Sequence, residues 1–426
     1  MRGRRIALDY PLMLLALVLS AAGIAAVYSA GQTDVSTGLV NLWRTQALYL
    51  ALGLGAAWGV SRVTVRVLDY LTPAVYGGAI AVLTVLLFIG RGAGTAQSTK
   101  SWIYIGGVSI GQPSELAKIA VVVMLAKVLS RRGEAPGSLV ELWRPVGIVA
   151  LPWLLVMAQP DLGTGLVFIG ILFAMLFWAG TSWQLLLLAA SPVISLVLAF
   201  STGLWGAWFI LLLALVFWFK PYVYESIAVI SANLITGVAA PLVWEHMMPH
   251  QQRRLLVFLD PSSDPLKGGY HVRQSQVAIG SGGWLGKGFT LGSQKRLAFL
   301  PAQQTDFIFS VIGEEFGFIG VMVVLGLLTW LMLRCIRVAA RSTNPFASLV
   351  AFGLVSMIFV HVLINVGMTV GVMPITGIPL PFFSYGGSFM LACWLAVGLL
   401  MRLSLEGRSE EHTSELQSRF GISYAV

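Results

Sequence analysis

The sequence is poor in charged residues and nearly free of cysteine. Asp, Glu, Lys and Arg make up 11% of the 426 residues, whereas soluble globular domains contain about 25%. A soluble body of this size would lack the polar side chains needed to cover its surface, so a soluble protein is excluded. The two cysteines, Cys335 and Cys393, lie inside apolar runs. This placement supports neither a disulfide framework nor a cysteine-based metal site.

Apolar residues supply 57% of the chain, and the mean hydropathy is +0.83. A helix needs about 20 predominantly apolar residues to cross a bilayer, and such runs recur between charged, Pro and Gly residues. We therefore predict an all-α polytopic membrane protein with about twelve transmembrane helices. The predicted helices span residues 11–28, 45–62, 73–90, 115–130, 144–158, 163–180, 183–201, 204–219, 225–245, 306–333, 348–372 and 383–404.

The basic residues form short clusters between the apolar runs instead of gathering on one surface. The net charge of +9 therefore indicates membrane topology, and we expect no nucleic-acid partner. If the N-terminus is cytoplasmic, the loops that carry Arg62, Arg131 and Arg334 are cytoplasmic too, as the positive-inside rule requires. The same count places a loop at 91–114 and a long segment at about 246–305 outside the membrane.

A polar stretch near the C-terminal end differs in composition from the rest of the chain. Residues 408–418 read RSEEHTSELQS, which is similar to the translation of a common sequencing-library adapter. We predict a single integral membrane domain over 1–407 and expect residues 408–426 to be an artefact or a disordered tail. No function is assigned to this tail.

Ionisable residues within or beside the predicted spans are candidates for function, because charge is costly in a bilayer. Glu115 and Lys118 lie three residues apart on one helix, Asp161 stands at a helix entrance, and Asp306 begins the helix predicted at 306–333. Each has a structural alternative. Glu115 and Lys118 could simply neutralise each other as an i, i+3 pair, and Asp306 could cap the N-terminus of its helix.

The long outer segment is basic on the side where the topology rule predicts no excess of Lys or Arg. An anionic partner, such as a phosphorylated lipid headgroup, would account for this charge; ordinary solvated charge is the alternative. The glycine-rich run at 280–288 lacks the spacing of a phosphate-binding P-loop, so its N–H groups could form an anion nest or its glycines could make tight turns. The basic candidates for anion binding are Arg253, Arg273, Lys287 and Lys295.

Several motifs follow one another along the chain in the order seen in a known group of polytopic proteins. They are Gln112-Pro113-Ser114-Glu115 with Lys118, Gln159-Pro160-Asp161, Gly269-Tyr270-His271, Thr305-Asp306-Phe307 with Glu314-Glu315, and Gly377-Ile378-Pro379-Leu380-Pro381 with Ser384-Tyr385-Gly386-Gly387-Ser388. Together they resemble the shape, elongation, division and sporulation (SEDS) family. The Gly-Tyr-His form, with Gly286-Lys287-Gly288, is more similar to the RodA branch of that family than to the FtsW branch.

The resemblance implies a multi-pass protein of the bacterial inner membrane that polymerises lipid II into glycan strands by inverting transfer, with release of undecaprenyl diphosphate, for cell elongation and shape. It gives Asp306 the role of the essential aspartate of the Thr-Asp-Phe motif, at an active site on the extracytoplasmic side. It places Glu115, Lys118 and Asp161 around a central cavity as substrate-binding residues. It also implies three kinds of partner, namely lipid II, membrane lipids, and a class B penicillin-binding protein, which is a transpeptidase of the elongation complex.

The sequence departs from the family pattern in three places. The family usually has ten spans, whereas residues 183–245 read as three helices in place of one; the inserted pair preserves the sidedness of Asp306. Ser101 stands where the family often has Arg before the Trp of the first large outer loop. The residues before Thr305 are Ala302-Gln303-Gln304 in place of Glu-x-His, so the chemistry cannot depend on that acid or that histidine.

The reaction that the resemblance implies needs one base, which Asp306 would supply, and cations that stabilise a leaving diphosphate. The sequence requires no cofactor, and a divalent metal could assist the diphosphate although no ligand cluster demands one. Two other functions stay open: a flippase that moves lipid II past Glu115, Lys118 and Asp161, and a non-catalytic scaffold that activates a transpeptidase. The basic outer segment that ends at Asp306 favours catalysis at one face of the membrane, and no internal repeat of the kind found in transporters is evident.

Overall fold

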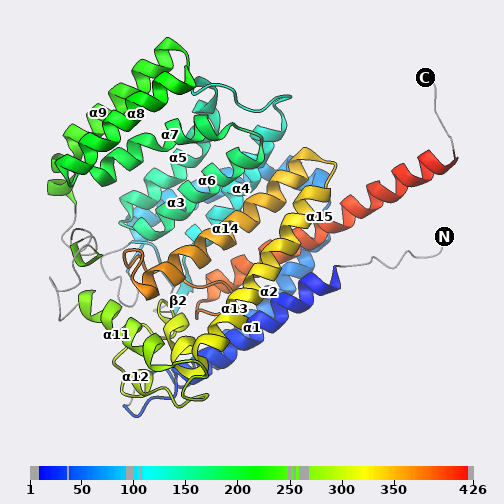
Figure 1. Cartoon of the computed structure of the whole chain (residues 1–426). Helices are drawn as coiled ribbons and strands as arrows, with labels where there is room; N and C mark the ends of the chain where they lie inside the picture. Colours follow the sequence, from blue (N-terminus) through cyan, green and yellow to red (C-terminus); the bar gives the residue numbers. More distant parts are fainter. Residues whose placement is uncertain are drawn as a thin grey trace.

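The computed structural model describes residues 9–35, 38–92, 100–105, 108–247, 252, 256–258 and 268–420. Long helices dominate these ranges and lie side by side in a bundle (Figure 1). Each of the twelve ranges predicted from the sequence overlaps one of them, which confirms the all-α polytopic prediction. The long helices are α1 (Tyr10–Ala30), α2 (Leu42–Ser61), α3 (Val65–Ile89), α4 (Ser114–Ser130), α5 (Trp143–Ala158), α6 (Leu162–Trp178), α7 (Trp183–Leu198), α8 (Thr202–Phe219), α9 (Val223–His246), α13 (Ile308–Arg341), α14 (Pro345–Val370) and α15 (Gly387–Phe420).

The connections between these helices hold several shorter elements. They show that the outer segment predicted at about 246–305 is folded, at least over the residues described from 268 onward. The shorter elements are β1 (Ile103–Ile105) paired antiparallel with β2 (Val108–Gly111), the 3-10 helix η1 (Val140–Leu142), and the helices α11 (Gly268–Ser281) and α12 (Ser293–Arg296).

Helix α14 is the central helix of the bundle. In the described part of the chain, eight helical stretches are long and apolar enough to cross a membrane, and α6 and α7 are shorter apolar helices. Among the eight, α14 is the most buried inside the protein and α8 the least. Helix α14 packs against α4, α6 and α13. Polar side chains on α14 are therefore shielded from lipid and can build an interior site.

The ends of the helices follow from local sequence. Asp9 caps α1, because its side chain accepts a hydrogen bond from the backbone N–H of Leu12. Asn344 caps α14 in the same way, just before a proline in the first turn, where the missing N–H of proline costs nothing. Gly371 ends α14 in the left-handed conformation (φ 83°) that glycine adopts most readily.

Helix α13 is broken at Gly317 (φ 62°, ψ −163°), which the sequence analysis did not predict. The break frees backbone groups that a continuous helix would pair, and the glycine-rich run pairs them instead. The N–H groups of Lys287 and Gly288 donate to the carbonyls of Glu314 and Glu315, both at 3.0 Å. These two N–H groups are therefore not available as an anion nest, and the run serves to dock one backbone against another.

Helices α7, α8 and α9, drawn in green in Figure 1, lie at one side of the bundle. They occupy the region where the sequence predicted three helices, and α7 and α9 are joined by a buried polar contact. The Asn233 amide donates to Ser191 Oγ at 2.8 Å and accepts from Ser195 Oγ at 2.6 Å. The pairing satisfies polar groups that lipid could not hydrogen-bond.

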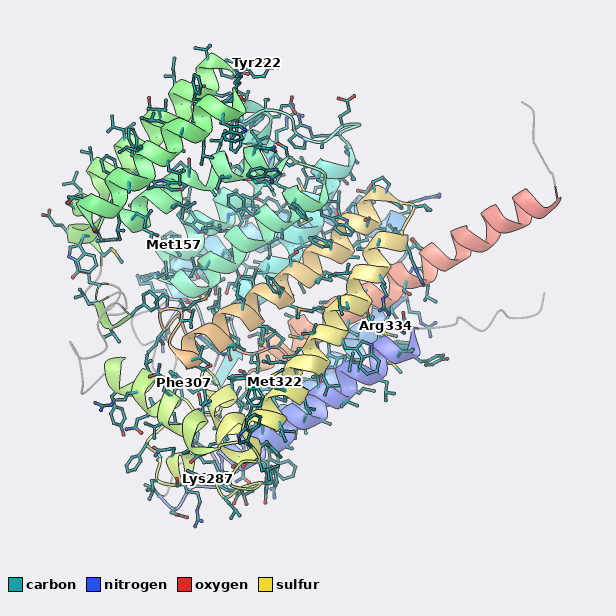
Figure 2. All side chains as sticks on the ribbon, in the orientation of Figure 1. Met157, Tyr222, Lys287, Phe307, Met322 and Arg334 are labelled. Carbon is teal, nitrogen blue, oxygen red and sulfur yellow. The ribbon has the colours of Figure 1, made fainter. Side chains whose placement is uncertain are left out.

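The two ends of the bundle can be followed along α13. Figure 2 shows Lys287 and Phe307 at the end that carries α11 and α12, whereas Arg334 lies at the opposite end of α13. Arg334 pairs there with Asp9 at 3.1 Å. Helix α15 runs on to Phe420 and so includes most of the polar stretch after residue 407; whether that stretch belongs to the natural chain stays a prediction.

Candidate active site

Asp306 lies in a turn, two residues before α13 begins. The prediction that Asp306 begins the helix is therefore wrong by two residues, and Phe307 is the residue that precedes the first helical position. The backbone carbonyl of Asp306 accepts a hydrogen bond from the Asn365 amide on α14 at 3.0 Å. Its carboxylate lies beside Gly377, where an added Cβ would stand 3.4 Å from Asp306 Oδ2. Neighbouring segments of the fold, and not the geometry of one helix, hold the Asp306 backbone, and its carboxylate lies beside one of them.

The segment 371–386, which we call the central loop, lies against residues 301–307, which we call the Asp306 turn. It joins α14 to α15 and contains the Pro-rich motif singled out in the sequence. Ser384 Oγ donates to the Thr305 carbonyl at 2.6 Å, and Tyr385 N donates to the Gln304 carbonyl at 2.8 Å. Two consecutive residues of the central loop thus hold the two residues immediately before Asp306.

Glu115 and Lys118 form the predicted ion pair, and both are buried. The Lys118 ammonium lies 2.7 Å from Glu115 Oε2 and also 2.7 Å from Nε2 of His361 on α14. The other ring nitrogen of His361 is 3.2 Å from the carbonyl of Pro379 in the central loop. The pair is thus more than an isolated i, i+3 neutralisation, because a neutral side chain connects it to the loop that holds the Asp306 turn.

Asp161 caps α6 from the position just before the helix and reaches the same region from another side. Its carboxylate accepts hydrogen bonds from the backbone N–H of Thr164 at 3.1 Å and from the Gln112 amide at 2.6 Å. The next residue but one, Gly163, packs so closely on the central loop that an added Cβ would lie 2.8 Å from the carbonyl of Thr376. The central loop therefore contacts the surroundings of Asp161, of the Glu115 pair and of Asp306.

Lys295 is buried and paired, whereas a lysine that binds a diphosphate must have an accessible ammonium group. Its side chain is 0% exposed, and its ammonium lies 2.5 Å from Glu315 Oε1 and contacts both the carbonyl and the hydroxyl of Ser29 on α1. An ammonium has three N–H donors, and these three contacts use them all. The prediction that Lys295 holds substrate is therefore corrected: in this structure it joins α12 to α1 and α13. Burial lowers the pKa of Lys295, and the hydrogen bond and charge of Glu315 oppose that shift.

The other basic candidates differ in their accessibility. Lys287 pairs with Glu314 at 2.7 Å but keeps 29% of its side chain exposed. Arg273 is exposed on α11, whose His271 ring lies against Phe307 with the ring centroids 6.3 Å apart. Arg253 lies outside the described residues. Over the ranges that the structure does describe, no group of three or more His, Cys, Asp or Glu residues is arranged to hold a metal ion.

Sequence reasoning missed three polar residues of this region, Gln112 as a partner of Asp161, and His361 and Asn365 as partners of the central loop. His361 and Asn365 are polar residues four positions apart within an apolar run. This spacing places both on one face of a helix, and their polarity inside a span was the signal that could have found them.

A buried ion pair, a helix-capping carboxylate and a third carboxylate, all arranged around one loop of a helical bundle, define a polytopic membrane protein with an interior polar site. The chain belongs to the family of cell cycle proteins that comprises FtsW, RodA and SpoVE, whose profile matches residues 10–206 and 193–409. This membership confirms the resemblance to the SEDS family.

Relatives with curated names share about a third of their residues with this chain. The peptidoglycan glycosyltransferase RodA of Treponema pallidum (strain Nichols) is 34% identical over an alignment 426 positions long, which covers 93% of this chain and 97% of that protein. The peptidoglycan glycosyltransferase MrdB of Escherichia coli (strain K12) is 33% identical over 401 residues, 94% of each chain.

Solved structures share the fold. A chain from a study of polymerization and crosslinking by a peptidoglycan synthase complex matches with a TM-score of 0.69 and 27% identity, over 94% of this chain and 98% of that one. An Asp-to-Ala mutant of the rod shape determining protein RodA of Thermus thermophilus matches with a TM-score of 0.61 and 26% identity, over 93% and 97%.

Proposed function

We propose that this protein is a peptidoglycan glycosyltransferase that polymerises lipid II into glycan strands for cell elongation and shape, with Asp306 as the catalytic base. The observation that carries the proposal is the hydrogen-bonded setting of Asp306 beside the central loop, at one end of a membrane-spanning bundle. The named relatives support the reaction class, since they are peptidoglycan glycosyltransferases.

The reaction is a direct displacement at an anomeric carbon. The 4-hydroxyl oxygen of one sugar forms a bond to C1 of another, and the bond from C1 to the lipid-linked diphosphate breaks, so the configuration at C1 inverts. The Asp306 carboxylate takes the hydroxyl proton, and undecaprenyl diphosphate leaves with the bonding electron pair. A positioned base of this kind contributes about 10²–10⁴-fold to the rate.

The leaving diphosphate needs positive charge more than it needs a proton. Arg273 is the best supported of the predicted cations because it is exposed on α11, the helix that contacts Phe307 next to Asp306. Lys287 retains an exposed part, although it already pairs with Glu314. We include Glu115, Lys118 and Asp161 in the site because their surroundings contact the same central loop that holds the Asp306 turn.

The arginines near the C-terminal end of α13 support the proposed orientation. Arg334 lies at the end opposite to Phe307 (Figure 2), and Arg337 and Arg341 follow it toward the end of α13. Lys and Arg concentrate on the cytoplasmic side of membrane proteins. We accordingly propose that the protein resides in the bacterial inner membrane with the Asp306 end on the extracytoplasmic side, where it meets lipid II. The similar chain from a peptidoglycan synthase complex supports a class B penicillin-binding protein as partner.

The test is polymerisation of labelled lipid II by the purified full chain in proteoliposomes, together with the penicillin-binding protein. Asp306→Asn should lower the rate about 10²–10⁴-fold. Asp34→Asn is the matched control, because Asp34 is an exposed aspartate that pairs with Arg296 on α12 at 2.9 Å, and it should leave the rate unchanged. Polymer from Asp306→Asn at the wild-type rate would refute the catalytic assignment and leave the scaffold function.

The same vesicles separate the flippase alternative, because transbilayer movement of lipid II without any polymer would support a transporter. The proposal includes no cofactor. Chelation with EDTA, followed by added Mg²⁺, tests in the same assay whether a divalent metal assists the diphosphate.

A further inference from the structure

Two uncharged polar side chains, His361 and Asn365, project from α14 into the protein interior. Both are buried, with exposed fractions of 1% and 0%. They lie four residues apart and so on the same face of the helix. A polar group in the membrane-spanning part of a protein is costly unless it is paired. Their pairing partners therefore indicate what they do.

The Asn365 amide joins the Asp306 turn to the central loop. Its nitrogen lies 3.0 Å from the carbonyl oxygen of Asp306 and 2.7 Å from that of Ile378. An amide nitrogen carries two N–H groups, so one group serves each carbonyl. Removing this side chain would leave both carbonyls without that donor and would remove the link that acts on Asp306 itself.

His361 joins the central loop to the buried ion pair. A lysine ammonium can only donate, so the 2.7 Å contact with Lys118 makes His361 Nε2 the acceptor. The proton of the neutral ring then lies on Nδ1 and is donated to the Pro379 carbonyl at 3.2 Å. Ile378 and Pro379 are consecutive, so α14 is hydrogen-bonded to two neighbouring carbonyls of the central loop.

The Asp306 turn and the central loop each contain a non-glycine residue in the left-handed conformation. Ala302 in the Asp306 turn has φ 48°, and Phe382 in the central loop has φ 67°. The left-handed conformation costs a non-glycine residue about 1–2 kcal/mol, and it persists only where the surrounding structure enforces it. Ser384 adds a further link, since its hydroxyl donates to the Thr305 carbonyl at 2.6 Å.

We propose that Asn365 and His361 form a clasp on α14 that positions Asp306 for proton transfer and connects it to the Glu115–Lys118 pair. The proposal rests on the function proposed above. Both are positioning residues: Asn365 acts through the Asp306 backbone, and His361 acts through the central loop. A misplacement of about 1 Å at a reacting group costs roughly 10²-fold in rate, and that is the loss expected when the clasp is opened.

The first test is Asn365→Ala in the lipid II polymerisation assay, with rates expressed per folded protein. We expect kcat to fall about 10²-fold with KM for lipid II unchanged, because substrate binding does not use this amide. Amide hydrogen exchange should rise in residues 301–307 and in the central loop. If this variant does not fold, Ser384→Ala removes the neighbouring link, the hydrogen bond to the Thr305 carbonyl, and should give the same pattern.

Asn233→Ala is the matched control for the loss of a buried amide. Asn233 is also fully buried, and its nitrogen donates to Ser191 Oγ and to the Val229 carbonyl, both at 2.8 Å. This variant should lose comparable thermal stability and keep the wild-type kcat, since Asn233 lies on α9 and contacts α7, away from the central loop. An equal fall in kcat for both variants would show a general structural effect and overturn the clasp.

The second test compares two replacements of His361. Glutamine can accept from Lys118 with its oxygen and donate to Pro379 with its nitrogen, whereas leucine can do neither. We expect His361→Gln to retain most of the wild-type kcat and His361→Leu to lose it. Equal activity of these two variants would contradict the role of His361 in the clasp.

The failure of the clasp differs from the failure of the proposed function. If Asp306→Asn is inactive while Asn365→Ala keeps the wild-type kcat, the clasp is refuted and the function stands. If Asp306→Asn polymerises lipid II at the wild-type rate, the catalytic role of Asp306 itself is refuted.

Discussion

Replacing Lys295 with methionine should destabilise the protein strongly, although the two side chains have nearly the same shape. Methionine has a similar length, but it removes the charge that compensates Glu315, which is 1% exposed. Breaking a buried ion pair by deleting one partner costs about 3–5 kcal/mol, because the other charge stays buried without compensation. The equilibrium constant for unfolding should therefore rise about 10²–10⁴-fold.

The measurement is the free energy of unfolding of the detergent-solubilised chain in a denaturant titration, followed by the fluorescence of its 14 tryptophans. Arg296→Met is the matched control from the adjacent position. Arg296 pairs with Asp34 at 2.9 Å on the surface, with side chains 44% and 53% exposed, and such pairs contribute at most about 1 kcal/mol. The double variant Lys295→Met with Glu315→Gln removes both charges and should regain most of the lost stability.

The pH dependence supplies a further check on the same variant. Burial lowers the pKa of Lys295 below its ordinary value of 10.5, so the unfolded chain holds this proton more tightly than the folded one. Between the lowered pKa and 10.5 the unfolded state binds more protons, and the free energy of unfolding of the wild type should rise with pH. Lys295→Met should lose this rise.

A cost of Lys295→Met no larger than that of Arg296→Met would refute the reasoning. It would mean that Lys295 is not held in the interior pair, and the residue would again be a candidate for binding the diphosphate.

Two further perturbations test the other buried contacts. Gly317→Ala should destabilise the protein by at least about 1–3 kcal/mol, because the residue has φ 62° and its Cβ would lie 2.4 Å from the nitrogen of Gly286. Gly280→Ala on α11 is the control, since its Cβ would meet open space, and it should be neutral or stabilising. Equal stability of these two alanine variants in thermal unfolding would contradict the break in α13. Lys118→Met should cost about 3–5 kcal/mol by leaving Glu115 without its partner, and the double variant with Glu115→Gln should recover most of that loss; no recovery in denaturant titrations would show that the ion pair is not the dominant contact.

The sequence predicted the helices well and the break in α13 not at all. Twelve apolar runs gave twelve helices because hydropathy is a local property, and a backbone in lipid must satisfy its own hydrogen bonds. The break at Gly317 depends on the glycine-rich run that docks beside it. This run lies 27 residues earlier in the chain and pairs the Glu314 and Glu315 carbonyls. A glycine inside an apolar run carries no sign of such a partner.

The candidate site divides in the same way. The sequence singled out Asp306, Asp161 and the Glu115–Lys118 pair from the rarity of charge in apolar surroundings and from motifs. It assigned Lys295 to a ligand because a basic residue in an outer segment looks available. The contact that removes it from that role is with Ser29, 266 positions earlier in the chain, and no local pattern encodes a separation of that size.

By itself, the sequence determined that the protein spans a membrane, where its helices lie and which charged residues are exceptional, since each of these depends on the composition of a short stretch of chain. Only the tertiary structure decided which charges neutralise one another and which carboxylate is held beside the central loop. Those outcomes depend on hydrogen bonds and ion pairs between segments far apart in the chain, and such contacts exist only once the helices have packed.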